Sequence, residues 1–435
     1  MGGSEVTEAG DDLGRRTLQK VIWRLIPFIF LCYIVAYIDR VNTSFAAKSL
    51  QLDLHLTKVE YGRGAGLFFL GYFLFEIPSN MILRRVGARI WIARIMIVWG
   101  IVSMGMIFVK GVWSFYIVRV ILGLSEAGFF PGMVLYLTYW IPARDRARAG
   151  ALFMMAAPVA MAVGGPLSGA LLEMNGHLGL KGWHWLFLIE GVPAVILGFL
   201  TLRFLTDSPE KADWLRPEER TWLLNEMDAE RARKASQMTS SVATTLSNPK
   251  VWLLCLIYCL NSSVTYGIFL WLPQILEELT GYKGFKLGLI NSLPFIAAIV
   301  GMIVIGAHSD KSGERKYHVA FCSALAAIGL GLAAVFSHQP VLFLLSFALC
   351  QVGQRSVMSV FWAIPPIFLG GAAAAAGIAL INAIGNVGGY FGPDMMGYLA
   401  KRTGGYAGGL GVLAGAMVLI SILVSSLRLP KERVA

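Results

Sequence analysis

The segments NMILRRVGAR (residues 80–89) and GAHSDKSGER (residues 306–315) occupy equivalent places in the two halves of this sequence. Each follows an apolar stretch. Each also has charged residues at its fifth and sixth positions, glycine at its eighth and arginine at its tenth. A motif repeated at the same place in each half indicates two repeats that run in the same direction. We therefore expect a fold with two pseudo-symmetric halves.

Apolar stretches long enough to cross a lipid bilayer lie on both sides of these segments. Of the 435 residues, 56% are hydrophobic and only 14% are charged, whereas a soluble domain averages about 25% charged residues. A spanning helix needs about 20 mostly apolar residues. The sequence thus predicts an all-α polytopic membrane protein with twelve transmembrane helices in two six-helix halves. The predicted spans are residues 21–46, 59–83, 89–109, 112–139, 146–173, 183–205, 249–279, 284–307, 316–336, 340–363, 369–399 and 404–428.

A polar interval after the sixth span divides the chain, and Trp214, Trp222 and Leu223 within it predict a short amphipathic helix at the membrane surface. Lysine and arginine cluster in both tails, in this interval and after spans 2, 4 and 8. The positive-inside rule then predicts cytoplasmic termini for a multi-pass protein of the plasma (inner) membrane. The predicted units are an N-terminal tail (1–20), a six-helix half (21–205), a central loop (206–248), a second six-helix half (249–428) and a C-terminal tail (429–435).

Several classes of protein are excluded by what the sequence lacks. The net charge of +11 comes from short clusters between apolar runs, which argues against a nucleic-acid partner. Neither H-E-x-x-H nor G-x-x-x-x-G-K-[ST] occurs, so we expect neither an enzyme nor an ATP-driven pump, and no metal or cofactor. Parallel halves are instead an architecture of secondary transporters, with the substrate site at the interface of the halves.

The two opening segments resemble the inter-helix motif of the major facilitator superfamily, although Asn80 and Arg84 depart from it in the first copy. Further motifs resemble the anion:cation symporter family, whose members carry tartrate, phthalate, hydroxyphenylacetate, galactonate, glucarate and related carboxylates. The resemblance covers essentially the whole chain and implies the major facilitator fold. The motifs that carry it are Tyr37–Arg40, Glu76–Asn80, Gly123–Gly128, Phe361–Pro365 and Gly377–Asn382.

Four ionisable residues inside spans 1 and 4 are the main functional candidates, because a charge within hydrocarbon costs at least about 2.5–3.5 kcal/mol. Arg40 and Arg119 are each expected about 10 Å inward from the outer surface. Glu126 follows Arg119 by two helical turns and faces the same way. Together with Asp39, these side chains are therefore expected to share one cavity.

This arrangement suits proton-coupled uptake of an organic anion. A guanidinium can hold a carboxylate through two hydrogen bonds. Burial favours the neutral form of a carboxylic acid, and protonation of Asp39 and Glu126 would free the arginines for the anion. The family resemblance implies the same roles: substrate binding for Arg40 and Arg119, and proton coupling for Asp39 and Glu126. The alternative is that Asp39–Arg40 and Arg119–Glu126 are pairs that only hold helices together.

The family resemblance also implies that Tyr72, Ser359, Trp362 and Asn382 line the substrate cavity. Tyr72 and Trp362 are equally compatible with simple packing. Relatives that carry sugar acids have a glutamine where this chain has the segment around Met154, and a threonine at the position of Phe361. These departures predict a less polar cavity and a less hydroxylated, for example aromatic, carboxylate.

The remaining alternatives concern direction and neighbouring charges. A proton-coupled antiporter that exports an organic compound is the competing transporter class, and a monomer is the default assembly. Glu76 and Arg94 are predicted to form a structural pair towards the cytoplasmic side. Arg355, in span 10, is interpreted as a snorkelling or interhelical residue.

Overall fold

The computed structural model describes residues 2–236, 247–368 and 371–427, and the regular secondary structure of these residues is entirely helical. Outside the described residues lie Met1, residues 237–246 of the predicted central loop, residues 369–370 at the start of the predicted eleventh span, and residues 428–435, which include the predicted C-terminal tail. Among the described helices, eleven segments are long and apolar enough to cross a membrane. The helices of the first half are α1 (Gly2–Phe45), α2 (Ala47–Asp53), α3 (Lys58–Val86), α4 (Ala88–Met104), α5 (Val112–Glu126), α6 (Phe129–Trp140), α7 (Ala143–Met154), α8 (Ala156–Leu172) and α9 (Gly182–Phe204).

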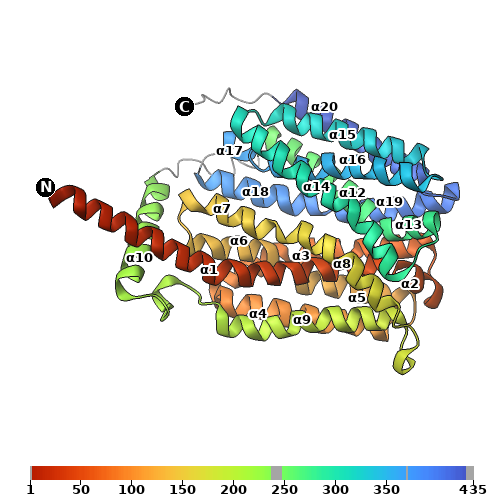
Figure 1. Cartoon of the computed structure of the whole chain (residues 1–435), viewed down its shortest axis with the longest axis horizontal. Helices are drawn as coiled ribbons and strands as arrows, with labels where there is room; N and C mark the ends of the chain where they lie inside the picture. The colour runs from red at the N-terminus through yellow and green to blue at the C-terminus, as the bar shows by residue number, and fades with distance from the viewer. Residues whose placement is uncertain (1, 237–246, 369–370, 428–435) are drawn as a thin grey trace.

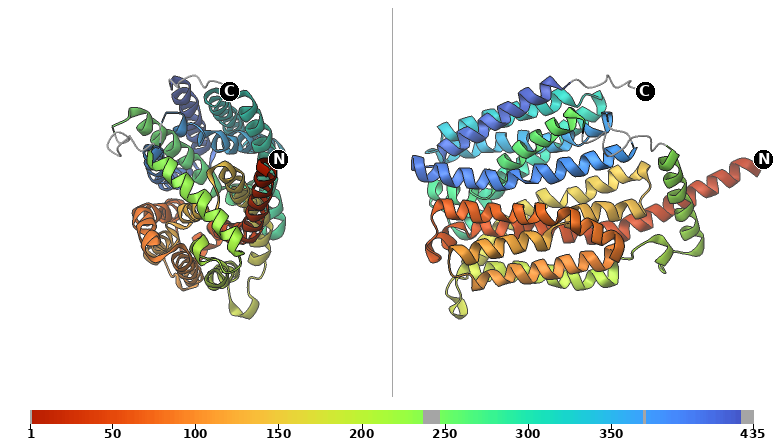
Figure 2. Two further views of the ribbon diagram at one scale, coloured as in Figure 1. Left: turned by 90° about the vertical axis from the view of Figure 1, so that its left-hand side faces the viewer. Right: turned by 180° about the vertical axis from the view of Figure 1, so that it is seen from behind.

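The second half follows a connecting helix, α10 (Pro217–Ser236). Figures 1 and 2 show its helices as one layer packed along the layer formed by α1–α9, with most long helices roughly parallel to the longest axis. The helices of this half are α12 (Pro249–Phe269), α13 (Leu272–Thr280), α14 (Gly284–Ser312), α15 (Lys316–Val335), α16 (Pro340–Phe361), α17 (Pro365–Phe368), α18 (Gly371–Asn386), α19 (Gly388–Thr403) and α20 (Ala407–Ser426).

Several predicted spans are divided into two helices. The span predicted over 112–139 is α5 followed by α6, which begins after Gly128 with a φ of +88°, a conformation that favours glycine. The span predicted over 369–399 consists of α18 and α19, which meet at Val387. An apolar pattern indicates length and not continuity of backbone hydrogen bonding, so it could not show these breaks.

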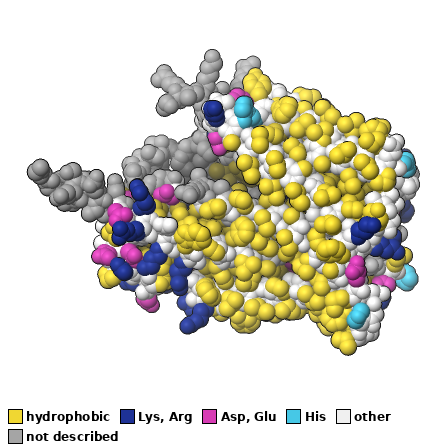
Figure 3. Space-filling view, viewed as in Figure 1, with side chains coloured by type: hydrophobic (Ala, Val, Ile, Leu, Met, Phe, Trp, Pro, Cys, Tyr) yellow, Lys and Arg dark blue, Asp and Glu magenta, His cyan; other side chains and the backbone are white. Residues whose placement is uncertain are grey.

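The surface has the distribution of side chains that a bilayer requires. Hydrophobic side chains cover the broad middle of the face in Figure 3, and charged side chains gather at its two ends. The large apolar side chains exposed on the protein surface include Trp113, Ile303 and Phe321. A wide, continuous apolar surface of this kind marks contact with lipid in a helical protein of this size.

The two repeated segments form tight turns between helices at the end of the bundle that carries α10. Gly87 has a φ of +100° and Gly313 a φ of +67°, which explains the shared glycine. In the second copy, Arg315 donates to Asp310 at 2.5 Å. The first copy lacks this acid, but Asp207 approaches from beyond α9 and accepts a hydrogen bond from the Arg89 backbone N–H at 3.0 Å.

The predicted amphipathic helix is present as α10, and its apolar side packs on protein. Leu223 is fully buried. Just before the helix, Trp214 stacks on Trp140 with 5.4 Å between ring centroids. Ion pairs join Lys20 to Glu219 at 2.7 Å and Arg146 to Glu230 at 3.0 Å. These contacts hold α10 against the helices of the first half.

The halves meet closely at the end of the bundle away from α10, which we call the closed end. Across the halves, Lys48 pairs with Glu277 at 2.8 Å, and the Tyr61 hydroxyl donates to the Leu270 carbonyl at 3.2 Å. Glycines allow the backbones to approach: a Cβ on Gly288 would lie 2.1 Å from the Gly165 carbonyl oxygen. At this end the two halves are therefore in direct contact.

Candidate functional site

A cavity of about 620 Å³ lies between the two halves. It extends towards the end of the bundle that carries α10, where its lining includes Asn80, Thr138 and Met154. Aromatic and aliphatic side chains form most of the wall. The acidic and basic residues in the wall are Arg40, Glu76 and Arg355. A large, mainly apolar cavity with a few polar groups is typical of a site for a small organic molecule.

Five of the six residues predicted to bind substrate line this cavity. Arg40 lies on α1 and Tyr72 on α3 in the first half. In the second half, Ser359 lies on α16, Trp362 directly follows α16, and Asn382 lies on α18. The sixth, Arg119, is not part of the lining. The side chains predicted for the site therefore come from both halves.

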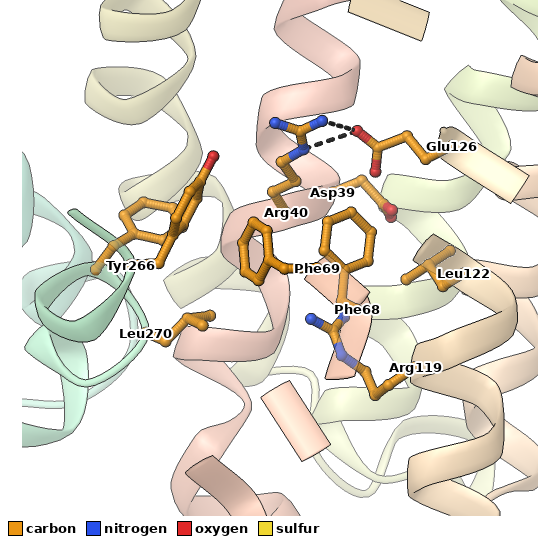
Figure 4. Close-up of a pocket in the computed structure, with 10 residues that line it drawn as sticks. Asp39, Arg40, Phe68, Phe69, Arg119, Leu122, Glu126, Tyr266 and Leu270 are labelled. Atoms are coloured by element: carbon orange, nitrogen blue, oxygen red, sulfur yellow. Dashed lines mark hydrogen bonds and ion pairs between the residues drawn. The ribbon is translucent and has the colours of Figure 1, made fainter. Parts of the chain in front are cut away.

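Arg40 and Glu126 form an ion pair beside the cavity (Figure 4). The Arg40 Nε donates to Glu126 Oε1 at 2.7 Å, and its Nη2 donates to the same oxygen. Glu126 is fully buried, whereas 12% of the Arg40 side chain is exposed. Arg40 also lies near the Tyr72 ring, with 5.4 Å from Cζ to the ring centroid. The guanidinium therefore faces the cavity while its carboxylate partner lies behind it.

Asp39 and Arg119 lie deeper in the first half. Asp39 Oδ1 accepts hydrogen bonds from Ser103 and from Asn42, the latter at 2.9 Å, while its Oδ2 has no hydrogen-bond partner. Arg119 donates to Thr43 Oγ1 and to the Ala65 carbonyl, each at 3.1 Å. Both side chains are almost completely buried. Their polar atoms are thus held mainly by uncharged neighbours.

All four ionisable residues of spans 1 and 4 surround one small cavity of about 10 Å³, roughly the space of one water molecule. The Phe68 ring separates its two arginines, as Figure 4 shows. Arg40 Cζ lies 5.7 Å from the ring centroid and Arg119 Cζ lies 5.1 Å from it. Arg119 is therefore shielded from the large cavity by an aromatic ring.

The ion pair found in the structure differs from the two pairs that the sequence suggested as a purely structural alternative. That alternative joined Asp39 to Arg40 and Arg119 to Glu126. In the structure the ion pair instead links Arg40 on α1 to Glu126 on α5. Spacing along one helix indicated which residues share a face. It could not show that Arg40, on another helix, would reach Glu126 first.

The predicted pair of Glu76 and Arg94 is wrong. Glu76 Oε1 instead accepts a hydrogen bond from Asn382 Nδ2 across the halves at 2.6 Å, and its Oε2 is buried without a hydrogen-bond partner. The Arg94 guanidinium lies over the Trp91 ring, 4.7 Å from its centroid. Glu76 lines the large cavity and Arg94 does not. The Glu76 carboxylate therefore finds its partner in the other half and not in Arg94.

The sequence interpretation missed Arg355, which lines the cavity from α16. Its Cζ lies 5.7 Å from the Phe295 ring centroid, and its Nε has no hydrogen-bond partner. A signal existed, because an ionisable residue well inside a span is a functional candidate by default. Of the two interpretations drawn from the sequence, snorkelling and an interhelical position, the structure agrees with the second, because the side chain borders the cavity between the halves.

The departures from the sugar-acid pattern affect the cavity unequally. Met154 lines it directly. Phe361 is fully buried and stacks on Tyr258, with 5.8 Å between ring centroids, and Tyr258 in turn lines the cavity. One departure therefore changes the wall itself, and the other supports an aromatic side chain in that wall.

Comparisons with known proteins agree with this architecture. A family model described as the Major Facilitator Superfamily matches residues 29–393 and 284–434. An Agrobacterium vitis protein named "Putative tartrate transporter" is 49% identical over 416 residues, which cover 95% of this chain and 94% of that protein. The "Quinolone resistance transporter" of Acinetobacter baumannii is 40% identical over 412 residues, which cover 95% of each chain.

Solved structures give the same fold. The inward-open xylose transporter XylE from E. coli matches with a TM-score of 0.74, covering 95% of this chain and 98% of that chain. The sequence identity is 14%, so this likeness concerns the fold alone.

Proposed function

This chain belongs to the major facilitator superfamily, and from that premise we propose that it takes up a small organic carboxylate together with protons by alternating access. As a member of that superfamily it is a multi-pass membrane protein and a secondary transporter, not an enzyme. We place it in the inner membrane of a bacterium, with both termini in the cytoplasm. The cavity then opens to the cytoplasm and the closed end faces outward.

The Arg40–Glu126 pair is the observation that carries the proposal. Arg40 is positioned to bind an anion in the cavity, but the buried Glu126 carboxylate already occupies its hydrogen-bonding side. A substrate carboxylate and an ionised Glu126 therefore compete for one guanidinium. Protonation of Glu126 removes the competitor, so proton binding and anion binding favour each other.

Asp39 and Arg119 are assigned to a second stage of the cycle. Both are almost completely buried and lie outside the lining of the large cavity, and Asp39 has one carboxylate oxygen without a hydrogen-bond partner. Opening of the closed end would bring water to this region and let Asp39 exchange its proton. Arg119 then keeps a positive charge close to the site, which favours entry of an anion from that side.

Two observations bear on which carboxylate is carried, and they point in opposite directions. Met154 and the aromatic wall favour a less hydroxylated substrate, as the sequence also predicted. The name of the Agrobacterium vitis relative points to tartrate, a hydroxylated dicarboxylate. We retain the aromatic or weakly hydroxylated carboxylate as the proposal. A preference for galactonate over phthalate and hydroxyphenylacetate in uptake assays would overturn it.

Export of an organic compound in exchange for protons is the second candidate. The quinolone resistance relative and the mainly apolar cavity favour it. The two candidates differ in the sign of proton movement that substrate induces. In the symporter, protons move in the same direction as the substrate, and in the antiporter they move in the opposite direction.

The decisive experiment measures external pH when carboxylates are added to de-energised vesicles that contain the protein. Symport predicts external alkalinisation with one class of carboxylate. This response should disappear in Arg40→Ala, because the substrate carboxylate would be left buried and unpaired. External acidification, or a response only to uncharged or cationic compounds, would establish the antiporter.

Glu126→Gln separates coupling from binding. The amide keeps the shape of the side chain but carries no proton to release. We expect this variant to exchange labelled substrate across the membrane but to lose accumulation driven by a pH gradient. Uphill uptake equal to that of the unsubstituted protein would remove Glu126 from the coupling role.

A further inference from the structure

Two guanidinium groups from opposite halves face the same cavity. Arg40 extends from α1 in the first half and Arg355 from α16 in the second, and both belong to the lining of the 620 Å³ cavity. Tyr37 and Tyr266 line the same cavity. The two cations are therefore separated by a space that these tyrosines border.

The charges of the two arginines are compensated differently. Arg40 is paired with Glu126. Among the residues that the structure describes, no acidic side chain pairs with Arg355, and its guanidinium lies 5.7 Å from the Phe295 ring centroid. Glu76, the other carboxylate in the wall, is hydrogen-bonded to Asn382. A partly buried cation without a carboxylate partner is costly in a wall that is otherwise mostly apolar.

We propose that Arg355 binds a second carboxylate of the substrate, so that the transported compound is a dicarboxylate held between Arg40 and Arg355. This inference rests on the proposed function and adds a substrate class and a specificity-determining residue to it. An anion in the cavity supplies the partner that Arg355 lacks. The first carboxylate displaces Glu126 from Arg40, and the second needs no displacement at Arg355.

The arrangement also links binding to movement of the halves. A dicarboxylate contacts one arginine in each half, so it is held fully only when the halves close around it. A monocarboxylate bound at Arg40 leaves Arg355 without a partner and cannot draw the two arginines together. Differential binding to the open and closed arrangements is what lets a ligand shift that equilibrium.

The test compares each of two dicarboxylates, tartrate and phthalate, with its own monomethyl ester. The two members of a pair differ in one negative charge. In the unsubstituted protein, the half-saturating concentration of the transported diacid should be roughly 10- to 100-fold lower than that of its monoester, as expected for one charge-assisted hydrogen-bonding partner. In Arg355→Gln, this ratio should fall to near one. Arg40→Gln should abolish transport of both members.

Arg94→Gln is the matched control, because Arg94 is also a partly buried intramembrane arginine but does not line the cavity. It should retain the ratio of the unsubstituted protein. Arg355→Lys, which keeps the charge, should retain part of the preference even if Arg355→Gln fails to fold. If Arg355→Gln weakens diacid and monoester equally, or if Arg355→Lys loses the preference while still transporting the monoester, the inference is overturned.

The outcome also separates this inference from the proposed function. Transport of hydroxyphenylacetate with protons, but of neither diacid, would overturn the dicarboxylate assignment and leave carboxylate symport standing. Failure of every carboxylate to move protons would overturn the proposed function itself.

Discussion

The closed end of the bundle and the opposite end, which carries α10 and which we call the open end, differ in how the halves touch. At the closed end, ion pairs, hydrogen bonds and glycine contacts cross the plane between the halves, among them Lys48–Glu277 and Arg63–Asp394. Towards the open end the cavity occupies this plane, and the Glu76–Asn382 hydrogen bond crosses it beside the cavity. The turns at that end, around Gly87 and Gly313, make their contacts within one half.

The difference shows where the cost of alternating access lies. Opening the closed end must separate backbones in close contact, whereas closing the open end requires apolar walls to meet. Close glycine packing is sensitive to a single added methyl group. Exposed ion pairs contribute about 0.2–1 kcal/mol each. The glycine contacts therefore contribute most to the stability of the closed state, and the ion pairs contribute less.

The largest expected effect comes from Gly288→Val. A Cβ at this position would lie 2.1 Å from the Gly165 carbonyl oxygen and 2.4 Å from its carbon, so α8 and α14 must move apart. Overpacking typically costs about 1–3 kcal/mol, which shifts the conformational equilibrium by about 5- to 150-fold. We expect transport to fall by a similar factor.

The accompanying measurement is labelling of Gln274→Cys by a membrane-impermeant maleimide. Gln274 is 5% exposed at the closed end, and it should react faster when Gly288→Val holds this end open. Gly411→Val is the control, because a Cβ there meets no atom within 4 Å. Unchanged labelling and transport in Gly288→Val would show that these glycines do not determine closure.

A smaller effect is expected from the Arg63–Asp394 pair, which joins α3 to α19 at 3.2 Å. The two side chains are 48% and 28% exposed, so water screens their attraction. Arg63→Gln should raise the labelling rate of Gln274→Cys by a factor of about 1.5–5. The exchanged pair Arg63→Asp with Asp394→Arg should restore the original rate. No restoration would mean that Arg63 acts through another contact.

Much of this fold could be predicted from the sequence, because bilayer thickness imposes a length on apolar stretches. The repeated motif supplied the division into halves, and its glycines have the positive φ that such turns need. The break at Val387 could not be predicted, since the flanking sequence is apolar and contains several glycines on both sides. Hydropathy is nearly the same for a straight helix and a broken one.

The candidate site was predictable only within single helices. Helical spacing placed Arg119 and Glu126 on one face of span 4, and both border the small cavity. The partner of Arg40 depends on the rotation of α1 against α5, and the partner of Glu76 lies 306 residues away in the other half. Such contacts depend on tertiary packing, which one sequence does not report.

The smallest expected effect lies in the turn between α14 and α15, at the open end. Glu314 accepts hydrogen bonds from the Tyr317 backbone N–H at 2.7 Å and the His318 backbone N–H at 3.1 Å. Partial burial raises the pKa of Glu314, but these hydrogen bonds and the contact with the His318 ring outweigh it and hold the pKa below its ordinary value. Its contribution to stability is therefore present at neutral pH and is lost as pH falls through that lowered pKa.

Glu314→Gln should lower the melting temperature in detergent at pH 7 by on the order of 1 °C, since one cap contact is spread over a large protein. The difference from the unsubstituted protein should shrink as the pH falls below the ordinary glutamate pKa of about 4.3 and close below the lowered pKa of Glu314. Glu218→Gln is the control, because that carboxylate is 62% exposed and lies 3.9 Å from Arg216. Transport should be unchanged in both variants, since this turn makes its contacts within one half. A loss of transport in Glu314→Gln alone would show that the open end depends on this turn more than the contrast with the closed end allows.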